Sequence, residues 1–171
     1  MNIKVINVSN GTSEYPGNFT PQEIDIITRS IKGTCLHLFS GKSLIGDVRV
    51  DFSQKEATHN RDVFNYIQEF NGFVDTILLD PPYNERFAEK YNKLAGFETN
   101  QFIIFANASK TTELFNQIIR INPKRIIIKS WNYYVPKGYT DIGSYLCYAG
   151  GYRKPTILMI CEKTKNLDSF L

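Results

Sequence analysis

Short apolar runs alternate along this chain with stretches in which apolar residues recur at helical spacing. The runs are continuous in apolar character, which is typical of strands covered on both faces. They predict strands at residues 35–39, 48–52, 74–79, 102–106, 125–130 and 157–161, and the alternating segment 3–8 allows a further short strand. Helical spacing predicts helices at residues 63–70, 86–94 and 112–121, the last ending before Asn122-Pro123. Strands separated by helices predict an α/β fold, with a mainly parallel sheet and helices on both faces.

The clearest helix start lies at Thr20-Pro21-Gln22-Glu23. Thr20 is a typical N-cap residue, Pro21 stands at the first helical position, and Glu23 occupies the capping-box position. Isoleucines at helical spacing follow until Gly33, which predicts the end of the helix. We therefore expect a helix ahead of the first buried strand.

Composition limits the number of domains and the kinds of partner. The chain has 171 residues, of which 42% are hydrophobic, so residues 1–171 are expected to form a single domain. A net charge of +3 neither requires nor excludes a polyanionic partner. Three cysteines without a C-x-x-C pair predict no disulfide framework and no metal site, and favour a reducing, cytoplasmic setting. Without a leader-like start or a long apolar run, no membrane association is expected.

A turn of small residues, Phe39-Ser40-Gly41-Lys42-Ser43, follows the predicted strand at 35–39, and Asp51 closes the next strand. Ligands of an open parallel sheet bind at the carboxyl ends of its strands. There, a small-residue turn lets the backbone approach a nucleoside, and a carboxylate can accept hydrogen bonds from ribose hydroxyls. Taken alone, this loop is equally compatible with a plain strand-to-helix turn.

The same residues invite a comparison with phosphate-binding loops. Gly41-Lys42-Ser43, followed by an apolar strand that ends at Asp80, is similar to the end of such a loop with its magnesium-binding aspartate. The full motif needs a glycine five positions before Gly41, where Leu36 stands within a predicted strand. Nucleotide hydrolysis is therefore disfavoured.

The second candidate loop, Asp80-Pro81-Pro82-Tyr83-Asn84, directly follows an apolar strand. Two consecutive prolines fix the backbone and remove two amide donors, so the Asp80 carboxylate and the Pro81 carbonyl can act as rigid acceptors. A base amine is a poor nucleophile because its lone pair is delocalised into the ring. Two acceptors that bind its protons localise that lone pair and favour methyl transfer. Tyr83 is expected to stack on a base that has left its helix.

These motifs resemble the amino-methyltransferase family that modifies exocyclic amines of adenine or cytosine with S-adenosylmethionine. The resemblance is carried, in order, by Leu38-Phe39-Ser40-Gly41, Asp51, Asn60-Arg61-Asp62-Val63-Phe64 and Leu79-Asp80-Pro81-Pro82-Tyr83. It covers roughly residues 20–161, and D-P-P-Y is its most specific part. It implies a Rossmann-like class I methyltransferase fold with a mainly parallel, seven-stranded sheet.

The resemblance also implies roles for individual residues. Cofactor contacts would come from Phe39, Ser40, Gly41, Asp51, Asp62, Val63 and Phe64, and catalysis from Asp80, Pro81, Pro82 and Tyr83. The chain departs from the family pattern at Ser43, where a second glycine is usual, and at His37, where an acid is common. We interpret His37 as a core histidine, since it stands between two leucines of a predicted strand. None of the cysteines follows a proline, which argues against methylation of a cytosine carbon.

Residues 131–154 are rich in glycine and tyrosine and fit either a functional loop or an irregular strand. Aromatic residues among cations are typical of a groove for single strands or flipped bases, although some of the tyrosines are expected in the core. The predicted substrate-binding residues are Asn84, Trp131, Tyr133, Tyr134, Arg153 and Lys154.

Together these features predict an S-adenosylmethionine-dependent enzyme that methylates a base amine of nucleic acid, with adenine N6 in DNA preferred. The alternatives are an RNA base amino-methyltransferase and a catalytically inactive subunit that binds nucleic acid. About 40 residues separate the cofactor loop from Asp80, so no separate target-recognition domain is expected. A homodimer or a partner subunit would then supply sequence specificity.

Overall fold

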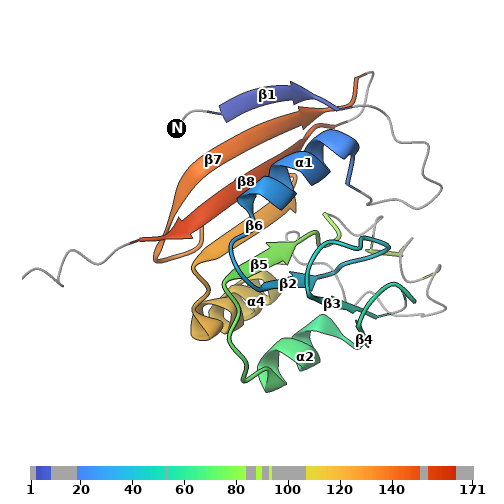
Figure 1. Ribbon diagram of the computed structural model, residues 1–171, viewed down its shortest axis with the longest axis vertical. Coiled ribbons are helices and arrows are strands. Elements are labelled where there is room, and N and C mark those ends of the chain that lie inside the picture. Colours follow the sequence, from blue (N-terminus) through green and yellow to red (C-terminus); the bar gives the residue numbers. More distant parts are fainter. Residues whose placement is uncertain are drawn as a thin grey trace, which may run out of the picture.

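The computed structural model describes residues 3–8, 19–52, 54–83, 88–89, 93, 107–150 and 154–164 (Figure 1). In chain order its elements are β1 (Ile3–Asn7), α1 (Pro21–Ser30), β2 (Cys35–Leu38), β3 (Val48–Asp51), β4 (His59–Asn60), α2 (Val63–Glu69), β5 (Thr76–Leu79), α4 (Ala108–Ile121), β6 (Arg125–Ser130), β7 (Tyr139–Tyr148) and β8 (Thr156–Lys163). The predicted strand at 102–106 and most of the predicted helix at 86–94 lie outside the described residues.

The described strands form one mixed sheet in the order β1-β7-β8-β6-β5-β2-β3-β4. Strand β8 runs antiparallel to β6 and β7, and the other neighbouring pairs are parallel. Among the described residues the sheet has eight strands, one more than the seven that the resemblance implies. Three described strands, β1, β4 and β7, add to the five that apolar runs predicted. The α/β class and the mainly parallel sheet are confirmed.

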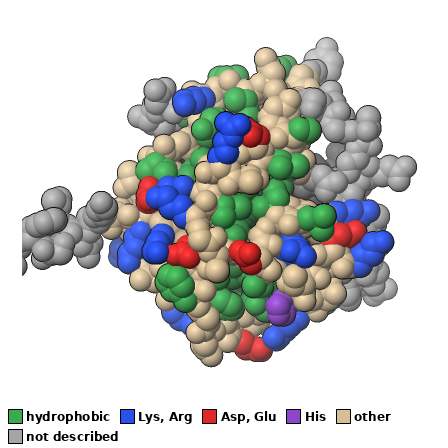
Figure 2. Space-filling model, in the orientation of Figure 1, with side chains coloured by type: hydrophobic (Ala, Val, Ile, Leu, Met, Phe, Trp, Pro, Cys, Tyr) green, Lys and Arg blue, Asp and Glu red, His purple; other side chains and the backbone are tan. Residues whose placement is uncertain are grey.

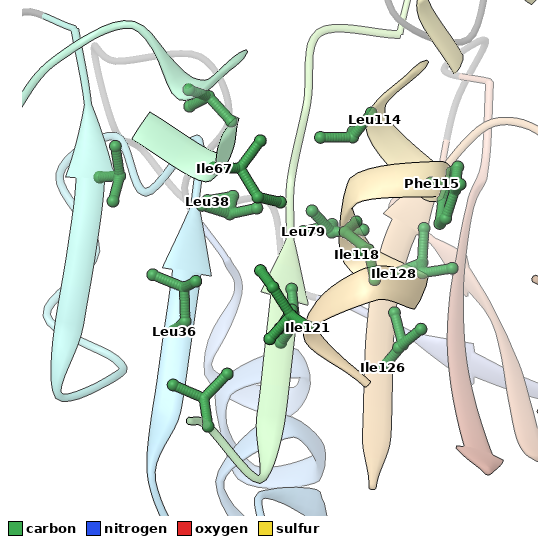
Figure 3. Close-up of a cluster of buried hydrophobic side chains, with 14 of the residues drawn as sticks. Leu36, Leu38, Ile67, Leu79, Leu114, Phe115, Ile118, Ile121, Ile126 and Ile128 are labelled. Atoms are coloured by element: carbon green, nitrogen blue, oxygen red, sulfur yellow. The ribbon is translucent and has the colours of Figure 1, made fainter. Parts of the chain in front are cut away.

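Helices cover both faces of the sheet, as Figure 1 shows. Helices α2 and α4 pack on one face, where Ile67, Leu114 and Ile118 contact a cluster that includes Leu36 and Leu79 (Figure 3). On the other face, a second cluster contains Ile27 of α1 with residues such as Cys35, Leu78 and Ile127. Alternate residues of each central strand therefore point to opposite faces.

Helix α1 begins with the predicted capping box. The Thr20 hydroxyl accepts a hydrogen bond from the Glu23 amide at 3.4 Å, and the Glu23 carboxylate accepts one from the Thr20 amide at 2.8 Å. The helix ends at Ser30, three residues before the predicted stop at Gly33. Gly33 has a φ of +55° and lies against Asp75, so a side chain there would meet both strain and a carboxylate.

The segment at 131–154 contains a long strand. After a loop at residues 131–138, β7 pairs in parallel with β1 and in antiparallel with β8, with a bulge between Asp141 and Gly143. Of the two readings of this segment, an irregular strand is the one the structure supports. Strand β1 confirms the short strand that the sequence allowed at residues 3–8.

The chain reverses its direction of travel across the sheet between β2 and β5. From β2 it moves outward through β3 and β4, and it then returns to place β5 on the other side of β2. Such a reversal is the topological switch point, where open parallel sheets bind ligands beyond the carboxyl ends of their strands. This position therefore selects the loops after β2 and β5 as the candidate site.

Within the described part of the chain, no helix is long and apolar enough to cross a membrane. On the face seen in Figure 2, basic and acidic side chains are interspersed. This mixture matches the small net charge of the sequence and does not by itself point to a polyanionic partner.

Candidate active site at the switch point

The two loops that the sequence singled out meet at the switch point. Leu38 at the end of β2 is in register with Leu79 at the end of β5, so Phe39 and Asp80 leave the sheet side by side. The Asp80 amide also faces the Leu38 carbonyl at 3.5 Å. Parallel pairing thus brings together two motifs that are 41 positions apart.

The loop after β2 has an unusual backbone. Phe39 has a φ of +60° and Gly41 a φ of +53°. A residue with a side chain rarely adopts such an angle, which costs about 1–3 kcal/mol and occurs often at ligand-binding sites. Hydrogen bonds from the Ser40 amide to Val50 and from the Ser43 amide to Ser40 hold this shape.

Asp51 links this loop to the loop after β3. Its Oδ2 accepts a hydrogen bond from the Gly41 amide at 2.9 Å, and its Oδ1 accepts one from the Gln54 amide at 3.3 Å. A carboxylate has about four lone pairs, so it can bind more than one donor at a time. Its predicted contact with the cofactor stays a prediction, whereas its bond to the loop was not foreseen.

Ser40 carries a buried hydroxyl at the centre of the first loop. Among the described residues, this hydroxyl has no hydrogen-bond partner. A buried polar atom normally finds a partner, and one without it is often completed by a ligand. This hydroxyl is therefore a candidate contact for a bound ligand or an ordered water.

Asp62, Val63 and Phe64 stand at the start of α2. Asp62 caps the helix, because its Oδ1 accepts a hydrogen bond from the Asn65 amide at 2.9 Å. Val63 and Phe64 are buried in the core cluster under α2. The structure gives these three residues capping and packing roles, and their contact with a cofactor stays a prediction.

The loop after β5 begins with the Asp80 carboxylate, followed by two prolines and Tyr83. Pro81 and Pro82 are buried, and Asp80 and Tyr83 are partly buried. The Tyr83 hydroxyl donates a hydrogen bond to Asp80 Oδ1 at 2.7 Å, a contact that the sequence did not reveal. Burial raises the pKa of the Asp80 carboxyl to about 6, although the Lys129 ammonium and the Tyr83 hydroxyl both act to lower it. Asp80 is therefore mostly an ionised acceptor at neutral pH.

Two predicted substrate residues lie beside this loop. The ring of Trp131 is 5.5 Å from that of Tyr83, centre to centre, at an angle of 40°. The Lys154 ammonium lies 4.5 Å from the centre of the Trp131 ring. We call Tyr83, Trp131 and Lys154 the aromatic row.

Tyr133 and Tyr134 make their contacts elsewhere. Tyr134 packs on Phe115 in the core, with ring centres 4.5 Å apart. The Tyr133 hydroxyl donates to Asp141 at 2.9 Å, near the start of β7 and away from the Asp80 end of the sheet. Asn84 and Arg153 lie outside the described residues.

A buried ion pair lies on the α1 side of the sheet. Lys129 Nζ is 3.0 Å from Glu23 Oε2, with both side chains almost fully buried, and it also lies 5.0 Å from the centre of the Phe19 ring. From the sequence, only a capping role was expected for Glu23, and its pairing with Lys129 was not foreseen. A lysine that follows three isoleucines in a buried strand was the available signal, because such a cation needs a buried partner.

Neither the buried cysteines nor His37 is suited to catalysis. Burial raises the pKa of Cys35, Cys147 and Cys161 to about 12, so none is a ready nucleophile. His37 is a buried core histidine, as interpreted: it stacks on Phe19, and burial lowers its pKa to about 4. Within the described residues, no group of His, Cys, Asp and Glu side chains could hold a metal ion.

No protein-family model matches this chain, and no functionally characterised protein matches it significantly. The functional conclusion therefore depends on the geometry of the site.

Proposed function

We propose that this protein is an S-adenosylmethionine-dependent methyltransferase that acts on an exocyclic amine of a nucleic-acid base, preferably adenine N6 in DNA. The observation that carries the proposal is the position of Asp80. Its carboxylate is held by Tyr83, precedes two buried prolines and stands beside the strained loop after β2. An acceptor for amine protons and a candidate donor-binding loop thus share the switch point.

The residues of the first loop fit the methyl donor. Phe39 and Gly41 would line its methionine end, the Ser40 hydroxyl has hydrogen-bonding capacity to offer, and Asp51 would accept from its ribose. When bound, the donor supplies a methyl group on a sulfonium sulfur, which needs no metal. Asp62, Val63 and Phe64 would contribute to the adenine end, chiefly through the start of α2.

Asp80 and Pro81 would hold the amine of the base. With both amine protons bound to these oxygens, the nitrogen lone pair would point at the methyl group of the donor. As the amine gains positive charge, the nearby Asp80 carboxylate stabilises it electrostatically. The proton then leaves through Asp80 or through water, and both routes are compatible with the geometry.

The aromatic row is the proposed surface for the target nucleotide. Tyr83 and Trp131 offer ring surface next to Asp80, and Lys154 offers a cation for phosphate. The same chemistry serves an unpaired adenine in RNA, which stays the alternative substrate. A catalytically inactive binding subunit is the second alternative. The hydrogen bond from the Tyr83 hydroxyl to Asp80 favours an active site over it.

The fold supports the same proposal at a coarser level. A mainly parallel sheet with helices on both faces is compatible with a Rossmann-like class I methyltransferase. Strand β1, which pairs only with β7 in the described sheet, would be an addition at its edge. We further propose one domain without a separate recognition unit, a homodimer or partner subunit for specificity, and a reducing cytoplasmic setting for the three buried free thiols.

Calorimetric titration with S-adenosylmethionine tests the donor site. We expect the wild-type protein to bind it, and Asp51→Asn to weaken binding about tenfold, because the charged bond that holds the Gly41 amide is lost. Asp25→Asn on the exposed side of α1 is the matched control and should leave affinity unchanged. A wild-type titration without heat at several temperatures would favour the inactive subunit.

A pair of substitutions at Tyr83 tests the aromatic row. Tyr83→Phe keeps the ring and removes the bond to Asp80, whereas Tyr83→Ala removes both. We expect the alanine variant to raise KM for an oligonucleotide about tenfold more than the phenylalanine variant does, since a stacked base is worth about 1–3 kcal/mol. Steady-state kinetics measure this difference, and equal KM values would contradict a stacking role.

A further inference from the structure

The Lys129–Glu23 ion pair lies next to the candidate catalytic carboxylate. Leu79 and Ile128 are paired in the register of β5 and β6, and both belong to the cluster on the α2 and α4 side. Side chains alternate along strands, so the next residues, Asp80 and Lys129, leave towards the α1 side. Glu23 reaches the same place from the first turn of α1.

We propose that Lys129 is a positioning residue: held by Glu23 in a buried ion pair, its ammonium keeps the Asp80 side chain in its charged, hydrogen-bond-accepting form. The inference rests on the proposed function for its role in catalysis. Its physical content, an interaction of the pair with Asp80, stands without it.

Burial strengthens the electrostatic interactions of Lys129 and Glu23 with neighbouring charges. Lys129 is 7% exposed at its side chain and Glu23 is 2% exposed, so water screens their charges weakly. Glu23 Oε2 also accepts from the Thr20 amide at 2.8 Å and the Thr20 hydroxyl at 3.1 Å, which fixes the carboxylate in place. Lys129 is thus bonded to a carboxylate that is itself fixed in place, and its strand directs it to the same side of the sheet as Asp80.

The charges act on Asp80 in opposite directions. Burial raises the pKa of Asp80, the Lys129 ammonium lowers it, the Tyr83 hydroxyl lowers it further, and Glu23 raises it slightly. Burial also works to lower the pKa of Lys129, but the carboxylates of Asp80 and Glu23 outweigh burial and raise it. His37 on β2 stays neutral above about pH 4, and the Cys147 thiol on β7 stays protonated below about pH 12. Lys129 therefore supplies the charge that keeps Asp80 ionised.

Two variants shift this balance in opposite directions without leaving an unpaired charge on Glu23. Glu23→Gln removes the competing negative charge and retains the capping box, because glutamine also serves at that position. Glu23→Gln with Lys129→Met removes both charges and leaves a neutral interior. If the ion pair had only a structural role, the two variants would not shift the pKa of Asp80 in opposite directions.

The test is an NMR titration of the protein labelled with ¹³C at aspartate carboxyls, with the Asp80 signal assigned through its loss in Asp80→Asn. We expect the apparent pKa of Asp80 to fall slightly in Glu23→Gln and to rise by about one unit in the double variant. Shifts in the same direction, or none in either variant, would overturn the inference. The readout needs no activity, so failure of methyl transfer would reject the proposed function while leaving these shifts to decide the inference.

Discussion

Asp80→Ala is expected to lower the rate of methyl transfer by about 10³-fold, while affinity for S-adenosylmethionine changes by less than about fivefold. The carboxylate is the only charged acceptor that the D-P-P-Y loop contributes, and the proline carbonyl alone cannot bind both amine protons. The donor would contact the loops after β2 and β3 instead, which do not depend on this side chain. Single-turnover rates and calorimetric Kd values measure the two effects separately.

Asp75→Ala is the matched control at the opposite end of β5. Its carboxylate binds Lys124 at 2.7 Å and the Thr34 amide at 3.1 Å, far from the switch point. Some stability should be lost, but the rate of transfer by the folded protein should stay within about twofold of the wild type. Unchanged turnover in Asp80→Ala would refute the role assigned to that residue.

Lys129→Met on its own is expected to lower the free energy of unfolding by about 3–5 kcal/mol. The substitution leaves Glu23 charged and buried, and a buried charge without a partner is far more costly than a neutral pair. Adding Glu23→Gln should recover much of the loss. Urea denaturation followed by circular dichroism gives the free energies, provided the slope with denaturant is the same in all variants.

Arg29→Met provides the comparison for this loss. Arg29 is 2.8 Å from Asp25, but the two side chains are 79% and 54% exposed, so the change should cost less than about 1 kcal/mol. If Lys129→Met were no more destabilising than Arg29→Met, the ion pair would be screened by water, and the account of Asp80 would lose its physical basis.

Most of the regular elements could be predicted from the sequence because each has a strong local signal. The continuous apolar runs gave β2, β3, β5, β6 and β8, and the Thr20 capping box gave the start of α1. Strand β4 was missed since His59 and Asn60 are exposed and pair only with the end of β3. The first turn of α4 was missed for a similar reason: none of its residues is buried, most of them are polar, and Asn107 caps them.

The sequence could predict only the part of the site that follows from the order of the strands. The switch-point rule brings the loops of Phe39 and Asp80 together once a parallel sheet is assumed. The contact of Lys129 with Glu23 spans 106 positions and depends on how α1 crosses the sheet, which no local pattern encodes. The same limit applies to Tyr133 and Tyr134, whose neighbours are set by the course of the loop before β7.

The most direct test of the central claim uses S-adenosylmethionine with a deuterated methyl group. The protein is incubated with single-stranded and duplex DNA and with RNA, and the digested nucleosides are examined by mass spectrometry, with Asp80→Ala in parallel. We expect deuterated N6-methyladenine from DNA with the wild-type protein and almost none with the variant. Binding of the donor without a labelled base amine in any of the nucleic acids would contradict the central claim.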